Sequence, residues 1–190
     1  MATVQVRNRA TIGGSLCNAS PSADTAPALI VLGARGKIVG VSGERVILLE
    51  DFFTGPGQTV LKSDEILGEV QVSNPPPRSG GVYIKQTVRK ALDLAIVGVA
   101  VLVTMEGPIL REVKIALGAV APTPIRARRA EEILRGRTIT DGLLEKAGQM
   151  AMEESSPIDD VRSSAEYRRK MVKVLAMRAM RQAVEQTKAT

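Results

Sequence analysis

A nine-residue break divides this chain of 190 residues into two parts. The break is the run Ser73-Asn74-Pro75-Pro76-Pro77-Arg78-Ser79-Gly80-Gly81. Proline has no amide hydrogen to donate to a sheet and the Ser-Gly-Gly end is flexible, so we expect no regular element here. The sequence therefore predicts one part over residues 1–72, a linker over 73–81 and a second part over 82–190.

Three long strands are predicted in the second part. Their apolar, β-branched runs cover residues 81–87, 93–105 and 109–119. The last two are joined by Glu106-Gly107-Pro108, a turn short enough to imply an antiparallel pair. The apolar run from Leu94 to Val103 is shorter than the roughly 20 residues that a helix needs to cross a bilayer. We therefore expect a buried strand there and no transmembrane segment.

Three helices are predicted after these strands. The first has Thr123 as N-cap, Pro124 as its first residue and Gly136 as its stop, with a Glu131 and Arg135 pair one turn apart. The second covers residues 140–154, and the third begins at a capping box formed by Ser163 and Glu166. The expected apolar face of the third consists of Tyr167, Met171, Val174, Leu175 and Ala179. The predicted class is α+β, with a three-stranded antiparallel sheet packed with about three helices.

Smaller elements are predicted in the first part. Residues 37–41 and 45–49 read as a hairpin in which Gly43 takes the positive φ of the turn. A helix or helical turn is expected over 25–32, and a short strand over 65–72. Residues 51–57 are expected to form a loop whose two phenylalanines, Phe52 and Phe53, are assigned to the core, with one of them near a cofactor as the alternative.

Composition excludes several classes of chemistry. The chain contains no histidine and a single cysteine, Cys17. An internal disulfide, a zinc or haem site of the usual kind and a Ser-His-Asp or Cys-His catalytic set are therefore excluded. Cys17 is expected to be small buried filler, with a reactive thiol as the alternative. The N-terminus has no apolar signal-peptide core and one cysteine suits a reducing compartment, so we expect a cytoplasmic protein.

The net charge of +6 raises the possibility of an anionic partner. Five arginines are expected on the first helix of the second part: Arg126, Arg128, Arg129, Arg135 and Arg137. Nucleic acid is disfavoured, because aromatic side chains for base stacking are almost absent and no reading motif is visible. A solvated basic face or a docking surface for an acidic subunit remains.

The stretch from Thr11 to Pro27 carries the functional prediction. Gly13 and Gly14 allow a turn with positive φ, at which a ligand can approach the main chain and amide hydrogens can point at an anion. Short polar side chains follow, and Asp24 is an acceptor that could serve a ribose hydroxyl. These residues alone favour an ordinary surface loop over a phosphate cradle.

A resemblance changes that balance. The string RNRATIGGSLCNASPSADTAP, residues 7–27, resembles the second flavin-binding segment of the FAD-binding subunits of molybdenum hydroxylases, the xanthine dehydrogenase and aerobic carbon monoxide dehydrogenase family. The similarity continues in order through five further segments: Asp51-Phe52-Phe53-Thr54-Gly55, Asp64-Glu65-Ile66-Leu67, Tyr83-Ile84-Lys85, Ala91-Leu92-Asp93-Leu94-Ala95 and Ala165-Glu166-Tyr167-Arg168-Arg169. The first FAD-binding lobe of the family, with its own Gly-Gly loop, has no counterpart here. Residues 1–72 would thus be a partial α+β FAD-binding lobe.

The resemblance also implies roles for residues. Main-chain amides of residues 12–14 would face the FAD pyrophosphate, and Asp24 would accept from the adenosine ribose. Lys85 would approach the flavin, Asp93-Leu94 would lie beside the isoalloxazine ring and Leu67 near the adenine. The full implied set is Thr11, Ile12, Gly13, Gly14, Ser15, Asn18, Asp24, Leu67, Lys85, Asp93 and Leu94. The chain departs from the family at Ser15, where asparagine is more usual.

The resemblance finally implies a role within a complex. The family passes electrons from a molybdenum cofactor through iron–sulfur clusters to FAD and on to an external acceptor. The expected partners are a large molybdopterin-binding subunit, a small 2Fe-2S subunit and a polypeptide or missing segment that supplies the first lobe. The chain would be an oxidoreductase component without a catalytic residue of its own, inactive alone. The alternative is an interaction or assembly module that has lost flavin binding.

Overall fold

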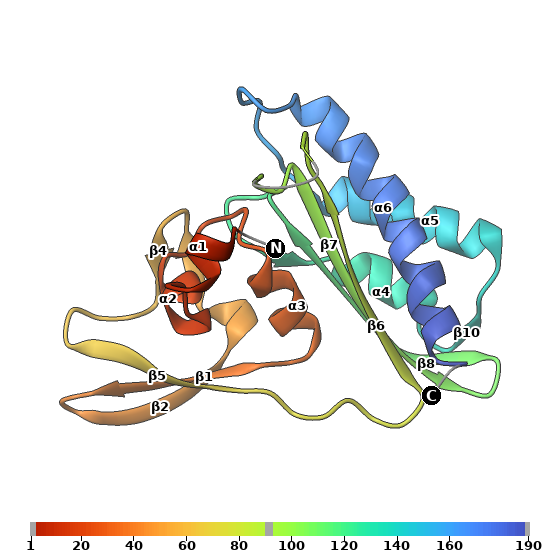
Figure 1. Cartoon of the computed structure of the whole chain (residues 1–190). Coiled ribbons are helices and arrows are strands. Elements are labelled where there is room, and N and C mark those ends of the chain that lie inside the picture. Colours follow the sequence, from red (N-terminus) through yellow and green to blue (C-terminus); the bar gives the residue numbers. More distant parts are fainter. Residues whose placement is uncertain (1–2, 90–92, 189–190) are drawn as a thin grey trace.

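The computed structural model describes residues 3–89 and 93–188 and has the predicted α+β class (Figure 1). A long antiparallel sheet runs through its middle in the order β10-β8-β7-β6, with β9 also pairing with β8. Its strands are β6 (Ser79–Gln86), β7 (Val97–Glu106), β8 (Ile109–Gly118), β9 (Ile125–Arg126) and β10 (Arg137–Thr138). The three long strands confirm the prediction, and the two-residue strands β9 and β10 extend the sheet along β8.

Helices of the second part cover one face of this sheet. They are α4 (Arg128–Leu134), α5 (Asp141–Glu154) and α6 (Ala165–Gln186). Figure 1 shows them together on one side, with the N-terminal elements on the other. Among the described residues, no helix combines the length and apolarity needed to cross a bilayer.

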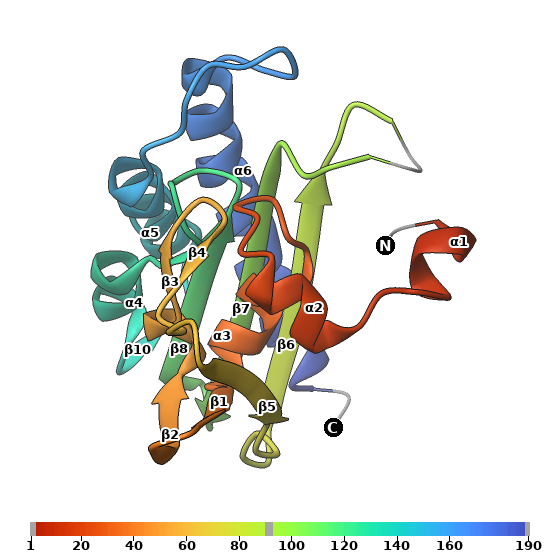
Figure 2. The same cartoon turned by 90° about the vertical axis from the view of Figure 1, so that its left-hand side faces the viewer.

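The N-terminal part contains short helices and a small sheet, which face the viewer in Figure 2. The helices are α1 (Val4–Arg7), α2 (Ile12–Cys17), α3 (Thr25–Val31) and the 3-10 turn η1 (Leu49–Asp51). The strands are β1 (Arg35–Gly40), β2 (Gly43–Leu48), β5 (Glu65–Gln71) and the short pair β3 (Phe53–Gly55) and β4 (Gln58–Thr59). The β1–β2 hairpin, the positive φ of Gly43 at 126° and the burial of Phe52 and Phe53 confirm the predictions.

Strand β7 contributes to both hydrophobic cores. Its four valines, Val97, Val99, Val101 and Val103, belong to the core under α4, α5 and α6. Ala100 and Leu102, on the other face, belong to the core formed with α2, α3 and the Phe52-Phe53 pair. The two parts of the chain therefore pack on opposite faces of the same strand.

The start of α4 differs from the prediction. Residues Ile125 and Arg126 pair with β8 as β9, so Thr123 and Pro124 do not begin a helix. The helix lacks a side-chain cap at its own N-cap residue and is capped from a distance, because the Glu154 carboxylate accepts from the amides of residues 129 and 130 at 3.1 Å each. No signal local to the sequence encodes such a cap.

The predicted partners of α4 differ too. Glu131 is buried and pairs with Arg126 at 2.6 Å rather than with Arg135. Arg126 lies in β9 and Arg137 in β10, so the five arginines do not share one helix. Arg126 and Arg128 both pair with Glu50 of the first part, which makes them contacts within the chain rather than a free basic face.

Helix α6 begins one residue later than predicted. Ser164 is the N-cap and accepts from the Tyr167 amide, while Ser163 is held by the turn at Asp160. The buried face is also shifted: Tyr167 and Val174 are exposed, and Arg168 is buried instead. The face is defined by Arg168, Val172, Leu175, Ala176, Ala179, Met180 and Ala183.

The segment between β5 and β6 is shorter than the nine-residue linker that the sequence predicted. Ser79, Gly80 and Gly81 pair with β7 as the start of β6, while β7 itself begins at Val97 rather than at residue 93. A side chain at Gly80 would overlap the carbonyl oxygen of Ala183. Glycine is required there because α6 approaches the β6 backbone directly.

We expect Gly80→Ala to lower the free energy of unfolding by about 1–3 kcal/mol, since strand and helix would have to separate. Gly81→Ala is the matched control: its new Cβ would lie 3.4 Å from Leu102 Cδ1, an ordinary contact. The control should change stability by less than about 1 kcal/mol. Urea unfolding of the two variants checks this, and equal effects would contradict the close approach of α6.

Candidate functional site

A cavity of about 700 Å³ opens over α1, α2 and the loop that leads to α3. It is lined mostly by small and apolar groups: Val6, Arg7, Arg9, Ala10, Thr11, Ile12, Gly14, Ser15, Asn18, Ser20, Ser22, Ala23, Asp24, Thr25 and Leu94. Most of the predicted cofactor residues are among them. Gly13, Leu67, Lys85 and Asp93 are not on the lining.

The Gly-Gly pair lies in a helix, so the predicted turn with positive φ is wrong. Thr11 is the N-cap of α2, and its Oγ1 accepts from the Gly14 amide at 2.9 Å. This leaves the amide hydrogens of Ile12 and Gly13, which have no acceptor in the described part of the chain, as expected of a first helical turn. The site therefore offers two free amide donors rather than three.

The two glycines have different surroundings. A Cβ added to Gly14 would lie 2.9 Å from Thr11 Oγ1 and disturb the cap, whereas a Cβ added to Gly13 would meet nothing within 4 Å. Behind them, Ser15 Oγ lies 3.3 Å from Thr25 Oγ1, which ties α2 to the first residue of α3. Ser15 is thus already engaged with the protein.

Two arginines at the cavity were not predicted as site residues. Arg7 ends α1 and Arg9 follows it, and both side chains are exposed on the lining. Within residues 3–89 and 93–188, no carboxylate pairs with either guanidinium. Two positive charges without a carboxylate partner among the described residues therefore line the same cavity as Ile12. The sequence signal was present, because both arginines belong to the string that carries the resemblance.

Asp24 is held by strand β6. Its Oδ1 accepts from the Tyr83 hydroxyl at 3.0 Å and its Oδ2 from Lys85 Nζ at 2.8 Å. Its side chain is 10% exposed, so the carboxylate is nearly enclosed by these partners and only its edge reaches the cavity. Burial, followed by the negative charge and hydrogen bond of Asp24, raises the pKa of Tyr83, which therefore stays protonated and donates. Tyr83 was not predicted as a site residue.

Lys85 links this pair to the loop before β7. Besides Asp24, its Nζ donates to the main-chain oxygen of Asp93 at 2.7 Å. The Asp93 carboxylate accepts from the amides of Arg89 and Leu94 at 2.9 Å each. The amide of Arg89 is the largest cause of a lowered Asp93 pKa, so this carboxylate stays ionised. Leu94 then projects into the cavity with its side chain half-exposed.

The assignments of Leu67 and Cys17 differ from the prediction. Leu67 is on β5, where it packs over Gly36 in the core of the first part, away from the cavity. Cys17 is exposed, so its assignment as buried filler is wrong. Neighbouring atoms still cover part of its thiol, and this desolvation raises the pKa of Cys17. Ala91-Leu92 lies outside the described residues.

Two family models match the chain. One, described as CO dehydrogenase flavoprotein C-terminal domain, matches residues 82–183. The other, described as FAD binding domain in molybdopterin dehydrogenase, matches residues 1–75. They cover the two parts of the chain in the order in which the resemblance runs.

Curated relatives agree with these matches. The chain is 34% identical over 189 residues to the carbon monoxide dehydrogenase medium chain of Afipia carboxidovorans, covering 100% of this chain and 64% of that protein. It is 35% identical over 181 residues to the glyceraldehyde dehydrogenase medium chain of Sulfolobus acidocaldarius, covering 94% of this chain and 63% of that protein. It is 30% identical over 181 residues to the xanthine dehydrogenase FAD-binding subunit of Escherichia coli O157:H7, covering 95% of this chain and 62% of that protein. The chain thus spans less than two-thirds of the length of these relatives.

Solved structures confirm the fold. CO dehydrogenase from Oligotropha carboxidovorans has a chain that matches with a TM-score of 0.93 and 34% identity, over 97% of this chain and 64% of that chain. Quinoline 2-oxidoreductase from Pseudomonas putida 86 has a chain that matches with a TM-score of 0.89 and 31% identity, over 98% of this chain and 65% of that chain.

We expect Lys85→Met to lower the free energy of unfolding by about 1–3 kcal/mol, because it leaves the enclosed Asp24 carboxylate with Tyr83 as its one partner among the described residues. Lys37→Met is the control, since Lys37 pairs at 2.7 Å with the exposed Glu44. An ion pair at the surface contributes little to stability, so the control should lower the free energy of unfolding much less than Lys85→Met does. Chemical unfolding compares the two, and similar losses would refute the anchoring role of Lys85.

Proposed function

This chain belongs to the family of the CO dehydrogenase flavoprotein C-terminal domain, and we propose that it is the FAD-binding component of a molybdenum-containing oxidoreductase. In this proposal FAD lies in the cavity over α2, receives electrons from iron–sulfur clusters and passes them to an external acceptor. The observation that carries it is the group of free amide donors and unpaired arginines inside the segment that matches the FAD-binding model.

The donors fit a diphosphate. The amides of Ile12 and Gly13 are free in the first turn of α2, and Ile12 lines the same cavity as Arg7 and Arg9. A diphosphate carries two negative charges and several acceptor oxygens, which these donors match in sign and number. Asn18, at the end of α2, adds a side-chain amide to the lining.

The remaining proposed contacts are less direct. Asp24 reaches the cavity with one edge and would accept from a ribose hydroxyl there while Tyr83 and Lys85 hold it. Leu94 would give an apolar contact to the flavin, and Lys85 and Asp93 would act by fixing the Leu94 loop. Leu67 has no place in this cavity. When bound, the isoalloxazine ring supplies the electron transfer, and the residues of this chain bind and orient it.

The proposed complex contains a large molybdopterin-binding subunit and a small 2Fe-2S subunit, and we place it in the cytoplasm. A further polypeptide or segment would supply the first FAD-binding lobe, because the chain spans 62–64% of the length of its relatives. The chain would be inactive alone. The proposed division of the chain into two parts is supported by family matches that end at residue 75 and begin at residue 82, although Ser79–Gly81 of the predicted linker belong to β6.

One observation favours a second candidate, an assembly module without flavin. The Asp24 carboxylate and Lys85 ammonium satisfy each other within the chain, so this part of the site is complete without a ligand. Under that reading the sheet and helices of the second part would dock on neighbouring subunits. A visible absorption spectrum of the chain, alone and co-expressed with its partner polypeptides, separates the two candidates: a flavin spectrum supports the first, and its absence in both samples supports the second.

We expect Gly13→Val to weaken FAD binding about tenfold or more in the co-expressed complex, since its methyl groups would cover the free amides of α2. The fold should be unchanged, because the space around Gly13 is open. Gly142→Val is the matched control: Gly142 is also the second residue of a helix and also has open space around it. Titration of FAD by fluorescence, with circular dichroism for the fold, checks this. Equal FAD affinity in both variants would exclude α2 as the diphosphate site.

A further inference from the structure

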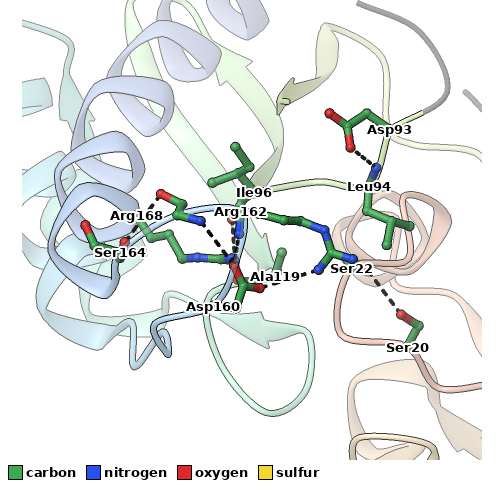
Figure 3. A network of polar contacts seen from close by, with 11 residues as sticks. Ser20, Ser22, Asp93, Leu94, Ile96, Ala119, Asp160, Arg162, Ser164 and Arg168 are labelled. Carbon is green, nitrogen blue, oxygen red and sulfur yellow. Dashed lines mark hydrogen bonds and ion pairs between the residues drawn. The ribbon is translucent and has the colours of Figure 1, made fainter. Parts of the chain in front are cut away.

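Arg168 is a charged side chain enclosed in the protein. It lies in the first turn of α6 with 4% of its surface exposed. An arginine cannot lose its charge at ordinary pH, so burial of this kind requires partners that replace water. Figure 3 shows its side chain running from α6 toward three other segments of the chain.

The guanidinium joins those segments. Its Nη1 donates to the main-chain oxygens of Ile96 and Ala119, each at 3.0 Å. Its Nη2 lies 2.7 Å from Asp160 Oδ1, close enough for an ion pair though not aligned for a hydrogen bond. One side chain thus ties α6 to the start of β7, the end of β8 and the turn before α6.

Main-chain amides also hold the Asp160 carboxylate. Its Oδ1 also accepts from the amides of Arg162 and Ser163, at 2.8 and 3.1 Å. Burial acts to raise the pKa of Asp160, but the hydrogen bond from the Arg162 amide and the ion pair with Arg168 outweigh it and hold the pKa below its usual value. The carboxylate therefore stays ionised opposite Arg168.

The two carbonyl groups that accept from Arg168 belong to segments next to the proposed flavin site. Ala119 has a left-handed backbone, with φ at 63°, and its amide donates to the Pro21 oxygen at 2.7 Å. Pro21 lies between Ser20 and Ser22, which line the cavity over α2. Ile96 follows Leu94 by two residues, and its amide donates to the Gln86 oxygen at 2.9 Å.

A second cavity of about 420 Å³ lies between these segments and adjoins the first. Ser20, Ser22 and Leu94 line both cavities, whereas Arg168 and Asp160 line the second alone. Figure 3 shows Leu94 and the Ser20–Ser22 pair on one side of this space and Arg168 with Asp160 on the other. The residues shared by the two cavities therefore belong to the chain segments that Ala119 and Ile96 adjoin: Ser20 and Ser22 flank Pro21, and Leu94 precedes Ile96 by two residues.

We propose that Arg168 is a positioning residue for the flavin site, which fixes the Leu94 loop and the Ser20–Ser22 segment relative to each other. This inference rests on the proposed function. It makes α6 part of the flavin-binding unit, although no residue of α6 reaches the cavity over α2. Lysine cannot replace arginine here, because an ammonium on a flexible stem cannot hold two carbonyls and a carboxylate in a fixed geometry.

The test compares Arg168→Lys and Asp160→Asn with neighbouring controls. Asp160→Asn keeps an oxygen for the Arg162 and Ser163 amides and weakens the contact to Arg168, so it serves if Arg168→Lys fails to fold. Arg169→Lys and Asp159→Asn are the controls, since Arg169 is exposed and Asp159 caps the Ala165 amide instead. Amide hydrogen exchange of the whole chain is measured first, because it does not depend on flavin. FAD affinity and the visible circular dichroism of bound flavin are then measured in the co-expressed complex.

We expect the Ala119 and Ile96 amides to exchange about tenfold faster or more in both test variants, with α5 and the β1–β2 hairpin unchanged. FAD affinity should fall about tenfold with an altered flavin dichroism, and neither control should show these changes. Unchanged exchange at Ala119 and Ile96, or faster exchange throughout the chain in both test variants, would overturn the inference. Faster local exchange with unchanged FAD affinity would also overturn it. A wild-type complex without flavin overturns the proposed function itself and is recognised before any variant is compared.

Discussion

Burial of β7 on both faces is the constraint on which the rest of the structure depends. The side chains of this strand alternate between the core under α4–α6 and the core of the N-terminal part. A strand that is apolar on both faces has no side that water can cover, so it is stable only when both faces are packed. The two parts separated by the proline-rich segment therefore complete each other, although each has a core of its own.

Two glycines of the sheet, Gly98 and Gly118, allow the close approaches that bring the site together. A Cβ on Gly118 would lie 2.9 Å from Pro27 Cγ, and a Cβ on Gly98 would lie 2.7 Å from the Tyr83 hydroxyl oxygen. Because these positions are bare, α3 and the Tyr83 ring lie directly against the sheet. That approach carries Asp24, the residue before α3, onto Tyr83 and Lys85 of β6. The contacts of Asp24 with Tyr83 and Lys85 thus depend on glycines of β7 and β8, which have no side chain.

Local patterns were sufficient where the controlling contacts are local. The hairpin around Gly43, the three long strands and the helix capped by Thr140 were predicted because periodicity, turn and cap residues lie within each element. The start of α4 depends on Glu154, distant in sequence, and could not be read locally. In the candidate site, the residues from Thr11 to Asp24 were predicted through the family resemblance, which a contiguous string of sequence is enough to carry. Tyr83 was missed because its role exists only once β6 lies beside α3.

Arg168 shows the limit of periodicity most clearly. A helical pattern assigns arginine to the solvent side, and that assignment placed Tyr167 and Val174 on the buried face instead. An apolar side chain would fill the same space without the desolvation of a charge, and buried ion pairs are often no more stable than such a replacement. What an apolar side chain cannot do is hold the oxygens of Ile96 and Ala119 while it faces Asp160. The contribution of this arginine is therefore to geometry more than to stability, and the geometry that it sets is that of the segments around Leu94 and Pro21.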